Sequence, residues 1–293
     1  MSVEAKARAT ALSCWSGKVD PQPLKGGITN TNFVVEDRGQ RFVVRIGDDI
    51  PVHGVLRFNE LAAARAAEAV GLSPAIVHHE PGALVMRHVE GRTLAAEDIA
   101  RRPMLERILP MIRLCHRELP KHLSGPVLMF WVFHVLRSYA HALENRGSAH
   151  LHQLPRLLAI AEELERAVGP IDVVFGHNDL LAANFIDAGE RLWLIDWDYA
   201  GFNSPLFDLA NLASNNGLTP QDEAWLLESY FGRCDAAILR RYHAMKCASL
   251  LRETMWSMVS ELTSTLDFDY PAYTRDYLGR FEAALASFKD RRP

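Results

Sequence analysis

The sequence lacks the long apolar runs that mark membrane proteins and secreted precursors. No stretch approaches the roughly 18 consecutive apolar residues that a membrane-spanning helix requires. The first residues, MSVEAKARATALSCW, carry charges at Glu4, Lys6 and Arg8 and have no apolar core. We therefore expect no signal peptide, no membrane partner and a cytoplasmic location.

Cysteine and excess positive charge are scarce as well. The four cysteines are scattered and form no Cys-x-x-Cys pair, so we expect reduced thiols and no disulfide framework. The twelve histidines form neither an HExxH motif nor a His/Cys cluster with zinc spacing. A formal net charge of -4 provides no basic field for nucleic acid. What remains is an ordinary globular composition, with 48% hydrophobic and 23% charged residues.

The order of the expected secondary structure indicates two lobes. Four short alternating segments predict two β-hairpins, at residues 33–36 with 41–47 and at residues 75–80 with 83–88. Residues 58–70, FNELAAARAAEAV, predict a helix between the hairpins, and helical patterns dominate from Ala95 onward. We therefore predict an α+β, bilobal protein. Its small β-rich N-terminal lobe comprises residues 1–90 and ends in a hinge, and its larger, mainly helical C-terminal lobe comprises residues 91–293.

Residues 174–201, VFGHNDLLAANFIDAGERLWLIDWDYAG, contain the densest group of chemically useful side chains. His177, Asp179 and Asn184 form a His-x-Asp-x-x-x-x-Asn motif, and the apolar segment LWLI leads directly to Asp196. A carboxylate such as Asp179 can orient a hydroxyl group and accept its proton. Oxygen ligands such as those of Asn184 and Asp196 suit Mg²⁺. The stretch therefore predicts transfer of a phosphoryl group to an alcohol, with Asp179 as the catalytic residue.

Two other polar residues are expected to support this stretch without taking part in the chemistry. We expect His177 to form hydrogen bonds within its loop and not to act as a base. Asp208 lies in the short helical segment PLFDLANLA, and we expect it to hold the catalytic loop in place.

A glycine-rich turn precedes the first hairpin. Glycine lets backbone N–H groups approach an anion closely, so this turn can hold phosphate groups. The residues that we expect to contact a nucleotide here are Gly27, Thr29, Asn30 and Asn32. A Gly-Gly pair is also common in turns that bind nothing, and that interpretation remains open.

Further nucleotide contacts are expected from the hairpins and the helix between them. Arg45 lies on an expected strand and Glu60 lies in the first turn of the expected helix. A strand cation paired with a helix carboxylate can direct positive charge at phosphates. Arg87 and Val89 lie where the chain leaves the second hairpin. Free backbone groups there suit the edge of an adenine ring, although the segment also fits a plain linker.

These motifs together resemble the choline/ethanolamine kinase family, within the larger aminoglycoside-phosphotransferase and protein-kinase-like fold group. The resemblance runs from about residue 20 to residue 288. It rests on the segments GGITNTNF, VVRIG, GHNDLLAANFI, LIDWDYAGFN and FDLAN. It implies a bilobal protein-kinase-like fold. In the order given, these segments would form the nucleotide-binding loop, the third strand, the catalytic loop, the strand that leads to the metal ligand, and the helix that follows it.

The C-terminal segment RETMWSMVSELTSTLDFDYPAY resembles the wall of the family's acceptor pocket. The resemblance assigns acceptor contacts to Tyr199, Trp256, Phe268 and Tyr273, whose aromatic faces can attract a methylated ammonium group. Packing in the core is the alternative role for these rings. Glu253 stands where the family often has a second tryptophan, and a carboxylate there suits a primary amine as well. The sequence departs from the family's pattern a second time at Asp198, where the family usually has glutamate.

The resemblance implies a kinase with ATP as co-substrate and Mg²⁺ as cofactor. We expect transfer of the γ-phosphate to the hydroxyl of a small amino alcohol, choline first and ethanolamine next. The second hypothesis keeps this chemistry and makes the acceptor an aminoglycoside, thiamine or another alcohol. The third is that the protein is a nucleotide-binding pseudoenzyme. The expected partners are small-molecule substrates only, and the chain is expected to be a monomer or homodimer.

Overall fold

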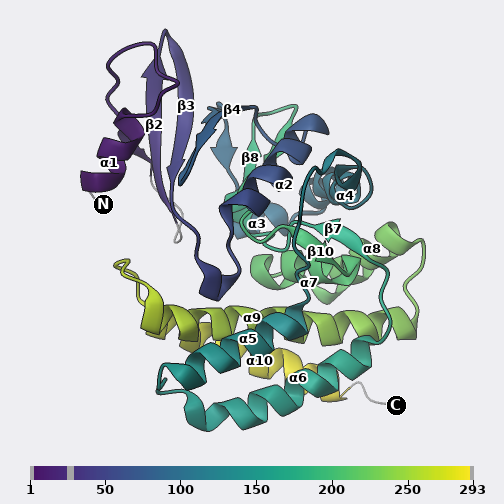
Figure 1. The fold of residues 1–293 in the computed structure, drawn as a ribbon. Helices are drawn as coiled ribbons and strands as arrows, with labels where there is room; N and C mark the ends of the chain where they lie inside the picture. Colours follow the sequence, from purple (N-terminus) through teal and green to yellow (C-terminus); the bar gives the residue numbers. More distant parts are fainter. Residues whose placement is uncertain (1–2, 25–29, 291–293) are drawn as a thin grey trace.

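The structure is a computed structural model that describes residues 3–24 and 30–290 (Figure 1). Its N-terminal part contains an antiparallel five-stranded sheet in the order β1-β2-β3-β5-β4. The strands are Gln22–Leu24 (β1), Thr31–Asp37 (β2), Gln40–Ile46 (β3), Ile76–Glu80 (β4) and Ala83–Arg87 (β5). The two hairpins predicted from the sequence are therefore confirmed, as β2–β3 and β4–β5.

One face of this sheet has its own apolar core. Phe42, Val44 and Ile46 alternate along β3 and are buried, as the period of two predicts. The N-terminal helix α1 (Val3–Thr10) packs on this face through small buried alanines. Arg45 points to the opposite face and is nevertheless buried, because it turns towards the rest of the chain.

Helix α2 (Arg57–Ala69) connects the two hairpins, as predicted, and follows a single 3₁₀ turn (Pro51–His53). Its buried side chains include four alanines, which allow its backbone to approach its neighbours closely. Asn59 and Glu60 are also buried, in its first turn. Asn59 donates to the backbone oxygen of Ala200 at 2.8 Å and accepts from the backbone of Leu128 at 2.9 Å. These bonds attach the start of α2 to the C-terminal part of the chain.

The C-terminal part is mainly helical, as predicted. Its helices are α3 (Ala96–Ile99), α4 (Arg102–Arg117), α5 (Val132–Asn145), α6 (Leu154–Val168), α7 (Pro205–Asn216), α8 (Pro220–Phe231), α9 (Ala236–Thr263) and α10 (Tyr270–Asp290). Short 3₁₀ turns lie at Leu119–His122, Leu151–Gln153 and Ala182–Asn184. Short strands are β6 (Arg92–Thr93), β7 (Val174–Gly176), β8 (Phe185–Asp187), β9 (Leu192–Leu194) and β10 (Gly201–Asn203). Strand β7 pairs with β10, and β8 lies between β6 and β9.

Helix α9 is the axis of this part of the molecule. It packs against α5, α6, α7 and α10 (Figure 1). Residues 247–260 are buried without interruption, which is typical of a helix that is enclosed on all sides. Polar side chains in this buried stretch therefore face other protein groups or an internal cavity. Across the described ranges, 3–24 and 30–290, we find no helix with both the length and the apolar character needed to cross a bilayer.

The fold confirms the predicted architecture of a β-sheet N-terminal part and a helical C-terminal part. Strand β9 ends at Leu194, one residue before the apolar segment LWLI ends, so Asp196 stands beyond the strand. The four cysteines are free. The boundary between lobes at residue 90 stays a prediction.

Candidate active site

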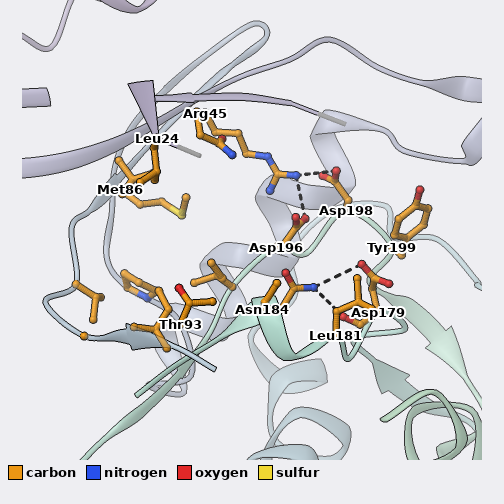
Figure 2. A pocket seen from close by; sticks show the side chains of 18 of the residues that line it. Leu24, Arg45, Met86, Thr93, Asp179, Leu181, Asn184, Asp196, Asp198 and Tyr199 are labelled. Atoms are coloured by element: carbon orange, nitrogen blue, oxygen red, sulfur yellow. Dashed lines mark hydrogen bonds and ion pairs between the residues drawn. The ribbon is translucent and has the colours of Figure 1, made fainter. Parts of the chain in front are cut away.

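A cavity of about 500 Å³ lies between the N-terminal sheet and the C-terminal part of the chain. It brings together Arg45 from β3, Asp179 and Asn184 from the loop after β7, and Asp196 from the segment after β9 (Figure 2). The cavity continues to Glu253 on α9. Residues far apart in the sequence therefore line one continuous space.

The loop that carries Asp179 is held mainly by one buried carboxylate. Asp208, at the start of α7, accepts hydrogen bonds from the backbone N–H groups of His177 at 3.0 Å and Asn178 at 2.7 Å. It also bonds to Nε2 of His116 at 2.9 Å. Burial would raise the pKa of Asp208, but the bond from His116 and the nearby donors hold that pKa below its ordinary value. Asp208 thus anchors the loop and does not face the cavity, as the sequence led us to expect.

His177 links the catalytic loop to the segment that carries Asp196. Its Nε2 lies 3.0 Å from the backbone oxygen of Ile195, and its Nδ1 accepts from the backbone N–H of Asp179 at 3.3 Å. Burial lowers the pKa of His177, which favours the neutral ring that this pattern of one donor and one acceptor requires. The predicted role of His177 as a loop hydrogen-bonding residue agrees with these contacts.

Asp179 is in an environment that opposes its ionisation. Burial raises the pKa of this carboxyl group well above its ordinary value, and the charge of Glu253 raises it further, while Arg252 opposes both. Nη1 of Arg252 lies 3.9 Å from Oδ1 of Asp179. A carboxylate whose pKa is raised in this way is a better proton acceptor than an exposed aspartate.

The residues predicted to hold Mg²⁺ present oxygen atoms to the cavity. The amide nitrogen of Asn184 donates to the backbone oxygen of Asp179 at 2.8 Å, which leaves its carbonyl oxygen available. Asp196 has a backbone φ of +69°, a conformation that few residues other than glycine adopt, and its side chain is 28% exposed. Within the described ranges, no three His, Cys, Asp or Glu residues are grouped as a metal site. Magnesium typically takes one or two protein oxygens together with phosphates and water, so this pair fits the ion.

A buried charge network joins the sheet, helix α2 and the segment after β9. Arg45 forms ion pairs with Asp196 at 2.9 Å and Asp198 at 2.6 Å (Figure 2). It also pairs with Glu60 at 2.9 Å. Arg57 pairs with Glu60 at 2.6 Å and with Asp198 at 2.8 Å. Burial opposes the charge of Arg45, but Asp196, Asp198 and Glu60 together raise its pKa. The predicted pair of Arg45 and Glu60 is thus present as part of a larger cluster.

The predicted phosphate-binding turn is described only in part. Gly27 and Thr29 lie outside the described residues. Asn32 lines the cavity. Asn30 bonds instead to the charge network, because its Oδ1 accepts from Arg57 at 2.7 Å and its Nδ2 donates to Asp198 at 3.2 Å.

Arg87 and Val89 both line the cavity where the chain leaves β5. The guanidinium of Arg87 donates to Gln40 at 2.6 Å and lies 5.4 Å from the ring centre of Phe42. Its charge is therefore directed along the sheet.

The acceptor end of the cavity is built from α9 and α10. Trp256 donates from its indole N–H to the hydroxyl of Tyr199 at 2.8 Å, and the Tyr273 hydroxyl lies 3.4 Å from Oε2 of Glu253. All four side chains line the cavity. Phe268 is not among the residues that line the cavity: it follows the end of α9, is 38% exposed, and its ring centre lies 5.7 Å from that of Tyr273. Its assignment as an acceptor contact stays a prediction.

Sequence reasoning missed two arginines at the site, Arg57 and Arg252. Arg57 stands three residues before Glu60, a spacing at which helical side chains meet. Arg252 and Glu253 interrupt the apolar run of α9, and an adjacent pair of opposite charges inside a buried helix signals an internal ion pair. Both signals were present in the sequence.

Comparisons with known proteins agree with this geometry. The sequence model of the choline/ethanolamine kinase family matches residues 22–225, well over half of the chain. Protein LicA of Haemophilus influenzae is 28% identical over 212 residues, which cover 70% of this chain and 61% of LicA. Ethanolamine kinase 2 of Mus musculus is 27% identical over 291 residues, covering 87% of this chain and 74% of that protein.

Solved structures show the same fold. A choline/ethanolamine kinase family protein from Mesorhizobium loti has a TM-score of 0.75 at 28% identity, covering 98% of this chain and 96% of that one. A thermostable mutant of the aminoglycoside phosphotransferase APH(4)-Ia shares the fold alone, with a TM-score of 0.60 at 17% identity, covering 92% and 96% of the two chains. The chain thus has a protein-kinase-like fold and belongs to the choline/ethanolamine kinase family, a family of phosphotransferases that act on alcohol groups.

Proposed function

We propose that the protein is an ATP- and Mg²⁺-dependent kinase that transfers the γ-phosphate to the hydroxyl of a small amino alcohol, choline or ethanolamine. The observation that carries the proposal is the position of Asp179. It lines one cavity together with Asn184 and Asp196, the residues that would hold Mg²⁺, and with Glu253, whose carboxylate can attract a cation. A nucleotide and a cationic alcohol can therefore meet at a single buried carboxylate.

Each group has a task that its surroundings support. ATP would lie beneath the sheet, with the charge of Arg45 directed at its phosphates and held there by Glu60. Asn184 and Asp196 would hold Mg²⁺, which neutralises the charge of the phosphoryl oxygens. Asp179 would orient the acceptor hydroxyl for in-line attack and accept its proton. Such transfer depends mainly on positioning and electrostatics, which a rigid, anchored loop provides.

The acceptor end favours an amino alcohol over an aminoglycoside. Aminoglycosides carry several amines and need several carboxylates in a wide cleft. Of the acidic residues in the C-terminal segment, only Glu253 lines the cavity. Glu261 is occupied elsewhere, since it bonds to His150 at 2.9 Å and to Thr274 at 2.6 Å. Glu253 is thus the carboxylate of this segment that a substrate ammonium group can approach, which suits an acceptor with a single amine.

A coupled ADP-release assay tests the proposal. The purified protein would be given ATP and Mg²⁺ with choline, ethanolamine, thiamine or an aminoglycoside in turn. We expect turnover with an amino alcohol that disappears in the Asp179→Asn variant. Turnover of thiamine or an aminoglycoside alone would assign a different acceptor. Binding of ATP without turnover of any acceptor would indicate a pseudoenzyme.

Two related predictions complete the proposal. We infer that the protein acts in the cytoplasm, where ATP is supplied. We infer that it works as a monomer or homodimer with small-molecule partners, and size-exclusion chromatography with light scattering would measure the oligomeric state.

A further inference from the structure

Arg252 lines the acceptor end of the cavity, and its guanidinium is enclosed by two aromatic rings and a carboxylate. We call this arrangement the cage. The guanidinium carbon of Arg252 lies 4.1 Å from the ring centre of Tyr199 and 5.4 Å from that of Phe130. The two rings meet edge to face, with centres 6.1 Å apart. The carboxylate of Glu253 closes the cage by an ion pair with Nη1 of Arg252. Aromatic faces combined with a carboxylate are the elements that bind an alkylated ammonium ion.

Arg252 is held in this cage as a bound ligand would be. Its side chain is only 1% exposed. Nε and Nη2 have no hydrogen-bond partner within residues 3–24 and 30–290 and almost no contact with solvent. A buried cation with two unpaired donors is costly unless other interactions compensate it. Here the compensation comes from Glu253, from Asp179 at 3.9 Å and from the ring faces. Glu253 and the ring faces are groups that a substrate cation would also use.

The other aromatic rings at this end offer less free surface. Trp256 lies against His53, with ring centres 5.4 Å apart and planes inclined by 35°. Tyr273 stacks on Tyr277 at 4.4 Å and 25°. Each of these rings therefore already has one covered face, and the face of Tyr199 is taken by Arg252. The cavity has few ring faces left for three methyl groups.

The two candidate ammonium groups need different partners. A trimethylammonium group has no N–H donor and depends on aromatic faces. A primary ammonium has three donors and depends on acceptors such as the carboxylate of Glu253, a residue that lines the cavity. Within the described residues, Oε2 of Glu253 accepts one long hydrogen bond, of 3.4 Å, from the Tyr273 hydroxyl.

We propose that Arg252 is a specificity-determining residue, which occupies the face of Tyr199 and so makes the site prefer a primary amine to its trimethylated analogue. The inference rests on the proposed function, because a preference between amines affects catalysis only if the site phosphorylates an amino alcohol. It reverses the order of acceptors suggested by the sequence, placing ethanolamine before choline. It predicts that opening the face of Tyr199 will allow a methylated cation to bind.

Two substitutions separate the charge of Arg252 from the space that it fills. Arg252→Ala removes the charge and uncovers the ring of Tyr199, whereas Arg252→Met removes the same charge but keeps an unbranched chain over that ring. Binding of tetramethylammonium and methylammonium would be measured by calorimetry without nucleotide. We expect the Ala variant to bind tetramethylammonium about 10-fold more tightly than the Met variant does. Methylammonium should distinguish the two variants much less.

Equal tetramethylammonium affinity in the folded Ala and Met variants would overturn the inference. The unmodified protein gives an independent test if the Ala variant fails to fold, as judged by circular dichroism. It should bind tetramethylammonium no more tightly than methylammonium, and a preference of about 10-fold for tetramethylammonium would refute the role of Arg252. These measurements do not require turnover, so failure of the proposed function would be recognised separately, by the absence of phosphorylated amino alcohol.

Discussion

The anchoring of the catalytic loop by Asp208 leads to a prediction that combines stability and activity. The substitution Asp208→Ala removes a carboxylate that is 1% exposed and accepts from the backbone of His177 and Asn178 and from the ring of His116. The variant leaves these three donors buried without partners. Asn178 has a φ of +64°, so the backbone in this region is already in an uncommon conformation.

The expected magnitude follows from those three donors. A buried donor without a partner costs about 1–3 kcal/mol, so three such donors cost roughly 3–6 kcal/mol in free energy of unfolding after partial relaxation. The total free energy of unfolding of a native protein is about 5–15 kcal/mol, so the variant should be only marginally stable. The melting temperature should fall by roughly 10 °C or more. Because Asp179 is carried by the same loop, kcat should fall by about 100-fold or more in the folded fraction.

Circular dichroism melts and urea unfolding measure the stability, and the ADP-release assay measures kcat. Asp208→Asn keeps one acceptor oxygen and should lie between the wild type and the Ala variant. Asp276→Asn is the control. Asp276 is 66% exposed, and its ion pair with Arg280 is long, at 3.7 Å. Losing this exposed pair should change the free energy of unfolding by less than about 0.5 kcal/mol. A melting temperature within about 2 °C of wild type for Asp208→Ala would refute the anchoring role.

Three further predictions concern the charges of the site and one buried histidine. Asp196→Asn should keep the fold but lower kcat by several orders of magnitude, and retained turnover at saturating Mg²⁺ would contradict a metal role. Arg57→Met should raise the KM for ATP by about 10-fold and change the KM for the acceptor little, because Arg57 joins Asn30 to the charge network. Equal changes in both KM values would contradict this role. Burial and the charge of Arg252 lower the pKa of His53 to about 3, so the unfolded chain binds a proton more readily than the folded one and stability falls as the pH drops below about 6.5. His53 should contribute about 2 kcal/mol of this loss between pH 7 and pH 5, so the loss measured by urea unfolding should be smaller by about that amount in a folded His53→Gln variant.

The local part of the site was predictable from the sequence. Asp179, Asn184 and Asp196 lie within eighteen positions of one another, and the strand order of a short hairpin-like segment brings them together. The alternation of apolar residues predicted the strand that carries Arg45, and the helical pattern of residues 58–70 put Glu60 in the first turn of a helix. These patterns are set by backbone geometry over short distances, so they can be recognised without knowledge of the tertiary structure.

The acceptor end was predicted less well because it depends on tertiary packing. Arg252 reaches Tyr199 only because α9 runs beside the catalytic loop, and nothing local specifies that contact. Phe268 was assigned to the pocket by resemblance, but it lies in the connection after α9 and is not among the residues that line the cavity. The choice of acceptor therefore depends on contacts between segments about fifty positions apart in the chain.

The central claim is that this cavity phosphorylates the hydroxyl of an amino alcohol. Phosphorus NMR of the purified protein with ATP, Mg²⁺ and ethanolamine or choline tests it most directly. We predict that ADP and a phosphomonoester of the amino alcohol form in equal amounts, with ethanolamine reacting faster than choline. Formation of ADP with inorganic phosphate only, or no reaction with either amino alcohol, would contradict the claim.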